Sequence, residues 1–304
     1  MDYQTILKTI QSEFQPDLSN GKVADYIPEL SKVDPLKFGL YLYCHDGSSF
    51  HFGDSHERFS IQSISKVFTL TIAKEMLGKD LWKRVDVEPS GTPFNSLSEL
   101  ERESGIPRNP FINAGSIVVA DALLSVLDDP KQDLLTFVRK LCGDDDIHYD
   151  EAVAKSEKKT GYRNKALVNY MKALGNIKND TDKILEFYFY QCSISMTCEQ
   201  LSKAFMLYAN EGKHFKTQEQ VIDTQSVKRI NSIMQTCGFY DEAGEFSYRV
   251  GLPGKSGVGG GIIAVHPQQY SVAVWSPMLN RKGNSALGMK TLERLTTLTG
   301  LSIF

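Results

Sequence analysis

The sequence contains few cysteines, no long apolar run and no excess of charge of either sign. With 34 basic and 37 acidic residues, its net charge of −3 gives no reason to expect nucleic acid or an acidic membrane surface as a partner. No apolar run is long enough to span a membrane, and the first ten residues lack the basic and apolar regions of a secretory signal. These absences predict a cytoplasmic protein that binds neither membrane nor nucleic acid.

Cysteine and histidine are also too sparse to predict a metal site. Among the six histidines, no His-Glu-x-x-His or clustered Cys/His pattern occurs. The cysteines are scattered and odd in number, which favours reduced, mostly buried thiols: Cys44, Cys142, Cys192, Cys198 and Cys237. We therefore expect no bound metal, and we expect no other cofactor.

What remains is the composition of an ordinary globular protein, with 41% hydrophobic and 23% charged residues in a chain of 304. Strand-like segments lie near both ends of the chain. The patterns predict strands at 38–44 and 48–52, around a tight Asp46-Gly47 turn, and at 246–250, 261–265 and 270–275.

Helical patterns occupy most of the remaining sequence. A polar loop over 16–25 follows a first helix at 3–14, and a last helix is expected from about 285 to 298. Between them lies a helical series that begins at Ser63 and includes 113–127, 133–141, 165–174, 182–191, 198–208 and 225–237.

This order of elements predicts an α+β fold with two lobes. Residues 1–60 and 238–304 would bring both sets of strands into one antiparallel sheet flanked by the terminal helices. Residues 61–237 would form an inserted all-helical lobe. Because ligands often bind between such lobes, we expect the active site in the cleft between them.

The first indication of chemistry is Ser63-Ile-Ser-Lys66. Serine needs a base within hydrogen-bond reach to act as a nucleophile, and residues three apart lie on one face of a helix, so Ser63 and Lys66 can form such a pair. The surrounding residues, from Phe59 to Met76, are largely apolar. They predict a buried helix in which burial lowers the pKa of Lys66.

A second motif, Lys255-Ser256-Gly257, lies in a glycine-rich segment between predicted strands. Glycine allows the backbone to approach another group closely. A Ser-x-x-Lys helix start followed by a Lys-Ser/Thr-Gly strand is typical of serine β-lactamases and penicillin-binding proteins.

Each motif also has copies that we interpret as chance matches. Ser19/Lys22 and Ser156/Lys159 repeat the Ser-x-x-Lys spacing without the apolar surroundings. Lys159-Thr160-Gly161 lies in a charged stretch with no predicted strand around it. The copies at Ser63 and Lys255 are therefore the ones that we expect to be functional.

Over nearly its whole length, the chain resembles the serine-dependent glutaminases, which share the β-lactamase-like fold. The matching segments, in order, are 25–30, 62–66, 88–91 with Phe94-Asn95, 109–115, Ser156-Glu157 with Arg163-Asn164, 187–189 with 191–194, 237–241 and 251–258. Several segments in the same order are more specific than either short motif. The resemblance implies a compact catalytic unit that hydrolyses L-glutamine to L-glutamate and ammonia, as a homodimer or homotetramer.

The resemblance also implies the catalytic roles. Ser63 would attack the side-chain amide of glutamine and form a glutamyl ester, and Lys66 would be its base. Tyr240 would relay protons. The backbone N–H groups of Ser63 and Val258 would form the oxyanion hole, where each donor is worth roughly 100- to 1000-fold in rate.

Further positions are implied to bind the substrate. Glu157 would pair with the ammonium group, although the sequence around Glu157 and Asn164 is charged and loop-like. The other implied binding positions are Tyr26, Gln62, Ser63, Asn113, Asn164, Tyr188, Tyr240 and Val258. Lys255 and Ser256 would support the site, and we expect Lys255 to help lower the pKa of Lys66.

Two alternatives stay open on the sequence alone. A β-lactam-processing or peptidoglycan enzyme could share this fold, but no Ser-Asp-Asn triplet follows Ser63, and Tyr162-Arg-Asn164 fits only a Tyr-x-Asn variant. A non-catalytic binding domain would keep the scaffold and bind glutamine without releasing ammonia. Penicillin acylation and ammonia release distinguish the three hypotheses.

Overall fold

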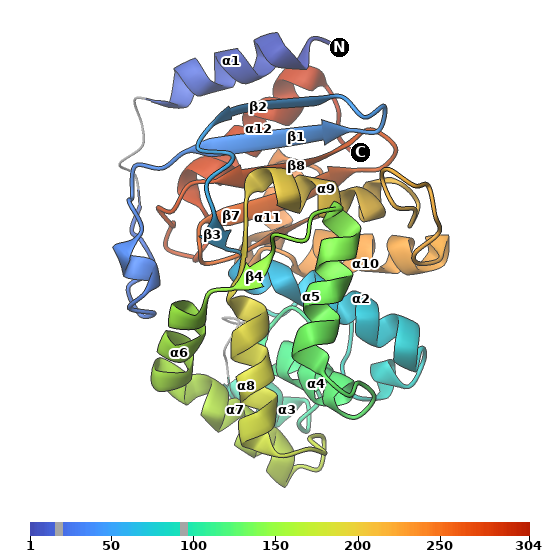
Figure 1. Ribbon diagram of the computed structural model, residues 1–304. Helices are drawn as coiled ribbons and strands as arrows, with labels where there is room; N and C mark the ends of the chain where they lie inside the picture. Colours follow the sequence, from blue (N-terminus) through green and yellow to red (C-terminus); the bar gives the residue numbers. More distant parts are fainter. Residues whose placement is uncertain (16–20, 92–96) are drawn as a thin grey trace.

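A five-stranded antiparallel sheet occupies the upper half of the molecule in the computed structural model, which describes residues 1–15, 21–91 and 97–304 (Figure 1). The strand order is β2-β1-β8-β7-β6. The strands are β1 (Gly39–Cys44), β2 (Ser49–Gly53), β6 (Gly254–Ser256), β7 (Gly261–His266) and β8 (Tyr270–Trp275). The predicted sheet of N- and C-terminal strands is confirmed. Part of the loop expected at 16–25, and Phe94-Asn95, lie outside the described residues.

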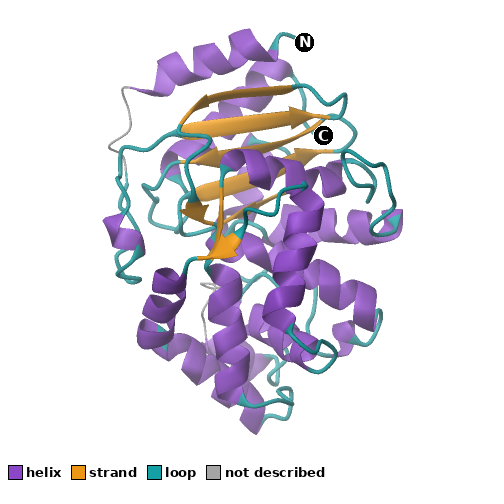
Figure 2. Cartoon of the chain, viewed as in Figure 1, coloured by secondary structure: helices purple, strands orange, loops and turns teal. Residues whose placement is uncertain are grey.

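The sheet is covered on both faces, and the alternation of its apolar residues explains why (Figure 2). On β1, Leu40 and Leu42 face the helices α1 (Tyr3–Phe14) and α12 (Ala286–Thr299), in one hydrophobic cluster. Tyr41, between them, belongs to a second cluster on the opposite face. Successive side chains of a strand point to opposite faces, so a strand buried on both sides reads as continuously apolar. The expected flanking by the terminal helices is confirmed.

The second face of the sheet packs against α9 (Cys198–Ala209), which contacts β1, β7 and β8. The same hydrophobic cluster continues into the helices in the lower half of Figure 1. These include α2 (Ser65–Leu77), α3 (Leu97–Arg102), α4 (Asn113–Leu124), α5 (Pro130–Cys142), α7 (Tyr162–Ala173) and α8 (Thr181–Cys192). The cluster also takes in α10 (Thr224–Cys237), which contacts α2, whereas α6 (Glu151–Thr160) packs against α8 outside it.

Aspartates begin several of these helices. A side-chain carboxylate accepts hydrogen bonds from backbone N–H groups of the first turn, which otherwise lack a partner in the helix. The N-cap aspartates are Asp2 for α1, Asp129 for α5, Asp150 for α6, Asp180 for α8 and Asp223 for α10. The helices predicted in the middle of the chain are confirmed, with ends that differ by up to three residues.

The strand predicted at 246–250 is wrong, because these residues belong largely to the helix α11 (Ala243–Arg249). Phe246 and Val250 are buried, whereas Tyr248 is 91% exposed. Phe246 stacks on Phe239, with ring centroids 3.5 Å apart. The two buried residues are four apart and lie on one face of a helix, a spacing that also fits strand alternation.

The prediction that residues 61–237 are all-helical is wrong, because this segment contains two short strands. β5 (Ile194–Met196) pairs with β3 (Phe59–Ser60) and β4 (His148–Tyr149) in a small antiparallel sheet. Strands of two or three residues are too short to show alternation in the sequence. The stretch around Glu157 and Asn164, expected to be a loop, forms most of α6 and the start of α7.

All five cysteines are buried, and none forms a disulfide. Within the ranges that the structure describes, no helix has the length and apolar character needed to cross a membrane.

Candidate active site

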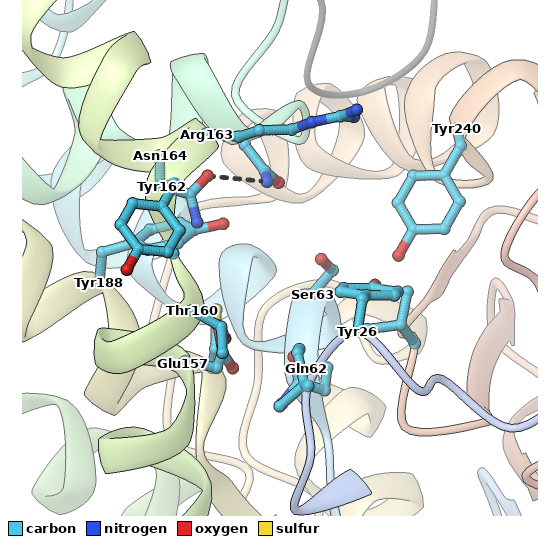
Figure 3. A pocket seen from close by; sticks show the side chains of 15 residues that line it. Tyr26, Gln62, Ser63, Glu157, Thr160, Tyr162, Arg163, Asn164, Tyr188 and Tyr240 are labelled. Carbon is cyan, nitrogen blue, oxygen red and sulfur yellow. Dashed lines mark hydrogen bonds between the residues drawn. The ribbon is translucent and has the colours of Figure 1, made fainter. Parts of the chain in front are cut away.

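A cavity of about 670 Å³ brings together residues from distant parts of the chain. It is lined by every residue that the sequence predicted to bind substrate: Tyr26, Gln62, Ser63, Asn113, Glu157, Asn164, Tyr188, Tyr240 and Val258. Figure 3 shows the Tyr240 hydroxyl directed towards Ser63, with Glu157 and Tyr188 across the cavity. The cavity therefore has a serine hydroxyl on one side and the carboxyl group of Glu157 on the other.

Ser63 lies in a short 3₁₀ turn, Gln62–Ile64, directly before α2. Gln62 has a φ of +50°, a left-handed conformation that is uncommon for a residue with a side chain. Its side-chain amide donates to the hydroxyl of Ser60 at 2.9 Å, and both residues are buried. Backbone strain of this kind persists only where the surroundings enforce it, and it clusters at functional sites.

The glycine-rich segment after Lys255 packs directly against the backbone before Ser63. A Cβ atom on Gly257 would lie 2.4 Å from the carbonyl oxygen of Ile61, and one on Gly259 would lie 2.1 Å from that of Ser60. Only glycine allows this approach. The segment thereby brings Val258 to the wall of the cavity that also holds Ser63.

Lys66 lies beneath the cavity and does not line it. It is 1% exposed, and its Nζ donates to the carbonyl oxygen of Phe111 at 3.1 Å and to Oδ1 of Asn113 at 2.7 Å. Burial lowers the pKa of Lys66 to about 8, although Cys192 and Glu157 act in the opposite direction. The predicted direction of the shift and its main cause are confirmed.

Lys255 is also buried, and it holds the turn that carries Tyr240. Its Nζ donates to the carbonyl oxygens of Gly238 at 3.1 Å and Ser256 at 2.6 Å, and lies 4.7 Å from the centroid of the Tyr240 ring. Burial, followed by the charge of Lys66, lowers the pKa of Lys255 well below its usual value. Burial is therefore the main cause of the lowered pKa at both lysines. Because repulsion between two like charges is mutual, the expected contribution of Lys255 to the pKa of Lys66 stays a prediction.

Tyr240 begins a 3₁₀ turn, Tyr240–Glu242, with a φ of +56°. It is the second strained residue at the cavity that is not a glycine. Burial raises the pKa of Tyr240, and a hydrogen bond with Ser63 partly offsets this rise. Its hydroxyl therefore stays protonated at neutral pH.

Glu157 comes from α6 and is 6% exposed. Its Oε1 is buried and has no hydrogen-bond partner among the described residues. Burial raises the pKa of this carboxyl to about 7, partly offset by a hydrogen bond from Gln62 and by the charge of Lys66. A buried carboxylate oxygen without a partner is costly unless a ligand supplies a donor.

Tyr26 is 55% exposed and lies on the segment that follows residue 20. Lys22 and Leu279 exchange two backbone hydrogen bonds, of 2.9 and 3.0 Å, which hold the start of this segment. Ile27 packs in a small apolar cluster with Val153 and Val258. These contacts place Tyr26 at the cavity, although the residue itself is largely accessible to solvent.

No cluster of three or more Cys, His, Asp or Glu side chains in the described ranges is placed to hold a metal ion.

Comparison with known proteins identifies the family. The family model described as Glutaminase matches residues 21–304. A glutaminase of Christiangramia forsetii is 67% identical over 304 residues, and the alignment covers 100% of both chains. The chain belongs to the glutaminase family.

Solved structures of glutaminases share the fold. The structure titled probable glutaminase ybaS is similar with a TM-score of 0.94 and 32% identity, over 99% of this chain and 97% of that one. A covalent complex of the Bacillus subtilis glutaminase YbgJ with 5-oxo-L-norleucine has a TM-score of 0.90 and 31% identity, with 100% coverage of both chains. The β-lactamase-like fold expected from the sequence is confirmed, and the chain is an amidohydrolase like its relatives.

Six further residues, which the sequence did not predict, line the cavity: Ile27, Thr160, Gly161, Tyr162, Arg163 and Cys192. Four of them flank the junction of α6 and α7, including the Thr160-Gly161 pair that was set aside as a chance match. A Cβ atom on Gly161 would lie 2.5 Å from the ring of Phe189 in α8, so the junction packs closely against that helix. A glycine between two helical patterns was the available signal.

Proposed function

We propose that this protein hydrolyses the side-chain amide of L-glutamine through a glutamyl ester on Ser63, giving L-glutamate and ammonia. The observation that carries the proposal is a buried amine, Lys66, three residues after a serine that lines a cavity. The covalent complex of the Bacillus subtilis relative supports a covalent route in this family member.

In the acylation step, Ser63 Oγ forms a bond to the side-chain carbonyl carbon of glutamine, and its proton passes to the neutral Lys66. The carbonyl oxygen becomes an oxyanion, which the backbone N–H groups of Ser63 and Val258 would stabilise. The C–N bond then breaks. Lys66 returns the proton through the hydroxyl of Tyr240 to the leaving nitrogen, which departs as ammonia.

In the deacylation step, water attacks the ester carbonyl and gives its proton to Lys66. The bond between the carbonyl carbon and Ser63 Oγ breaks, and the proton returns to the serine. Tyr240 can relay protons because its raised pKa keeps the hydroxyl protonated. Lys255 acts as a positioning residue, since it holds the Gly238 carbonyl and lies over the Tyr240 ring.

Recognition of a free amino acid requires partners for its charged groups. Glu157 provides a buried acceptor for the ammonium group through the oxygen that has no partner. Tyr26, Asn113, Asn164 and Tyr188 offer polar groups on the remaining walls. A hydrogen bond to a charged group is typically worth about 1.5–3 kcal/mol.

Ammonia release from L-glutamine by the purified protein is the direct test. L-asparagine, shorter by one methylene, is the second substrate, and a penicillin is the third compound, assayed for covalent acylation. Ammonia from glutamine supports the proposal. Penicillin acylation without ammonia release would favour a β-lactam-processing enzyme, and glutamine binding without turnover would favour a binding domain.

The rate is expected to rise with pH between about 6 and 8. Lys66 becomes neutral as the pH rises through its pKa of about 8. Glu157 becomes ionised as the pH rises through its pKa of about 7. Below pH 7, both active forms are depleted, so log kcat/KM should fall with a slope steeper than one. Steady-state assays across this range measure the profile, and a rate independent of pH from 6 to 8 would contradict it.

Glu157→Gln is expected to raise KM for glutamine roughly 30-fold, which corresponds to about 2 kcal/mol for a lost hydrogen bond to a charged group. The side chain keeps its size but loses its charge. Glu151→Gln, on the exposed start of the same helix, is the matched control, with KM unchanged. An unaltered KM in Glu157→Gln would remove this residue from the substrate site.

The predicted homodimer or homotetramer, the cytoplasmic location and the division at residues 60 and 238 stay predictions. Four residues of the cavity come from the terminal segments, namely Tyr26, Ile27, Tyr240 and Val258. The other lining residues come from 61–237. This composition supports a site between two lobes.

A further inference from the structure

The segment Asn109–Gly115, singled out in the sequence, forms a tight turn that ends beside Lys66. The side-chain oxygen of Asn109 accepts from the backbone N–H groups of Phe111 and Ile112, both at 3.0 Å. A Cβ atom on Gly115 would lie 1.9 Å from the carbonyl oxygen of Asn109, so the turn requires glycine there. The segment is thus held in one conformation before α4 begins at Asn113.

The turn presents two hydrogen-bond acceptors to Lys66. These are the carbonyl oxygen of Phe111, 3.1 Å from Nζ, and Oδ1 of Asn113, 2.7 Å from Nζ. A neutral amine has two N–H donors and one lone pair. If both donors are bound by these acceptors, the lone pair takes the remaining direction. Ser63 precedes Lys66 by three residues, across the junction of the 3₁₀ turn and α2, and this spacing favours side chains on one side of a helix.

The amide of Asn113 is itself oriented by a third residue. Its Nδ2 donates to Oδ1 of Asn164 at 3.1 Å, shown as the dashed line in Figure 3. If the Asn113 amide were reversed, its oxygen would face the oxygen of Asn164, and its NH₂ group would meet either the donors of a protonated Lys66 or the lone pair of the neutral amine. Asn164 therefore fixes which end of the Asn113 amide faces Lys66, and Asn164 lines the cavity.

We propose that Asn113 is a positioning residue for the general base: it aims the lone pair of Lys66 at Ser63, and Asn164 couples this orientation to occupation of the cavity. The inference rests on the proposed function and extends it, because substrate contact alone requires neither the bond to Lys66 nor the Lys66–Asn113–Asn164 chain. A group that only binds substrate affects KM, whereas a group that orients the base affects kcat and its pH dependence.

Asn113→Asp is the test, because it keeps the acceptor oxygen and adds a negative charge beside Lys66. An opposite charge within about 4–6 Å typically raises the pKa of a lysine by 1–3 units. The acid limb of kcat should therefore move to higher pH by about one unit or more. The control is Asn169→Asp on the exposed face of α7, which should leave the acid limb of the kcat pH profile unchanged. An unmoved limb in folded Asn113→Asp would overturn the inference.

Asn113→Ala provides a second readout that introduces no buried charge. Here kcat should fall at every pH, by roughly 10- to 100-fold, because the amine loses its orienting acceptor. A change confined to KM would overturn the inference. Failure of the proposed function itself is recognised separately, by wild-type protein that releases no ammonia from glutamine or by a Ser63→Ala variant that remains active.

Discussion

Ser63→Ala is expected to lower ammonia release from L-glutamine on the order of 10⁴-fold or more, as loss of a catalytic nucleophile does in other serine hydrolases. The side chain loses only its hydroxyl, so the fold should be retained. Glutamine should still bind, because Glu157 and the other polar groups of the cavity are unchanged. Steady-state ammonia assays and a binding measurement by calorimetry test both parts.

The chance copy of the motif offers a matched control. Ser156, followed by Lys159, has the same spacing on α6 but does not line the cavity. Ser156→Ala should retain wild-type activity. If Ser63→Ala retains appreciable activity while both variants are folded, the covalent mechanism on Ser63 is wrong.

Lys66→Met is expected to lower kcat by between about 10² and 10⁴-fold, the usual contribution of a general base. Methionine fills a similar volume and removes the amine without leaving a cavity. The carbonyl of Phe111 and the amide oxygen of Asn113 lose their donor. Unsatisfied buried acceptors cost about 1–3 kcal/mol each, so the midpoint of thermal unfolding should also fall.

The residual activity of Lys66→Met should lose the part of the pH profile that Lys66 produces, near its pKa of about 8. Lys159→Met, in the chance copy on the exposed side of α6, is the control and should leave both rate and profile unchanged. A Lys66→Met enzyme with near-normal kcat would show that another group serves as the base, and Lys255 would be examined next.

Local patterns in the sequence predicted most of the elements correctly. The apolar strands β1, β7 and β8 and the helices begun by aspartate caps carry their signal within a few residues. The prediction failed where that signal was ambiguous or short. Residues 246–250 satisfy both a two-residue and a four-residue spacing, and β4 and β5 have two and three residues.

The resemblance to the glutaminases identified nine of the residues that line the cavity and missed six. Every predicted substrate-binding residue lies at the cavity. The electrostatics around Glu157 were not predictable in the same way. It lies among Lys155, Lys158 and Lys159 in a sequence that resembles an exposed, charged loop. Its burial depends on packing of α6 against α8, which no local pattern records.

The sequence by itself determined the order of most elements, the three-residue spacing of Ser63 and Lys66, and the density of glycine after Lys255. These properties depend on neighbours three or four residues away. Only the tertiary structure decided which groups surround the amine. Asn113 is 47 residues from Lys66, and Asn164 is a further 51 from Asn113. Such contacts set hydrogen-bond geometry and desolvation, and these two quantities govern the pKa of Lys66 and the direction of its lone pair.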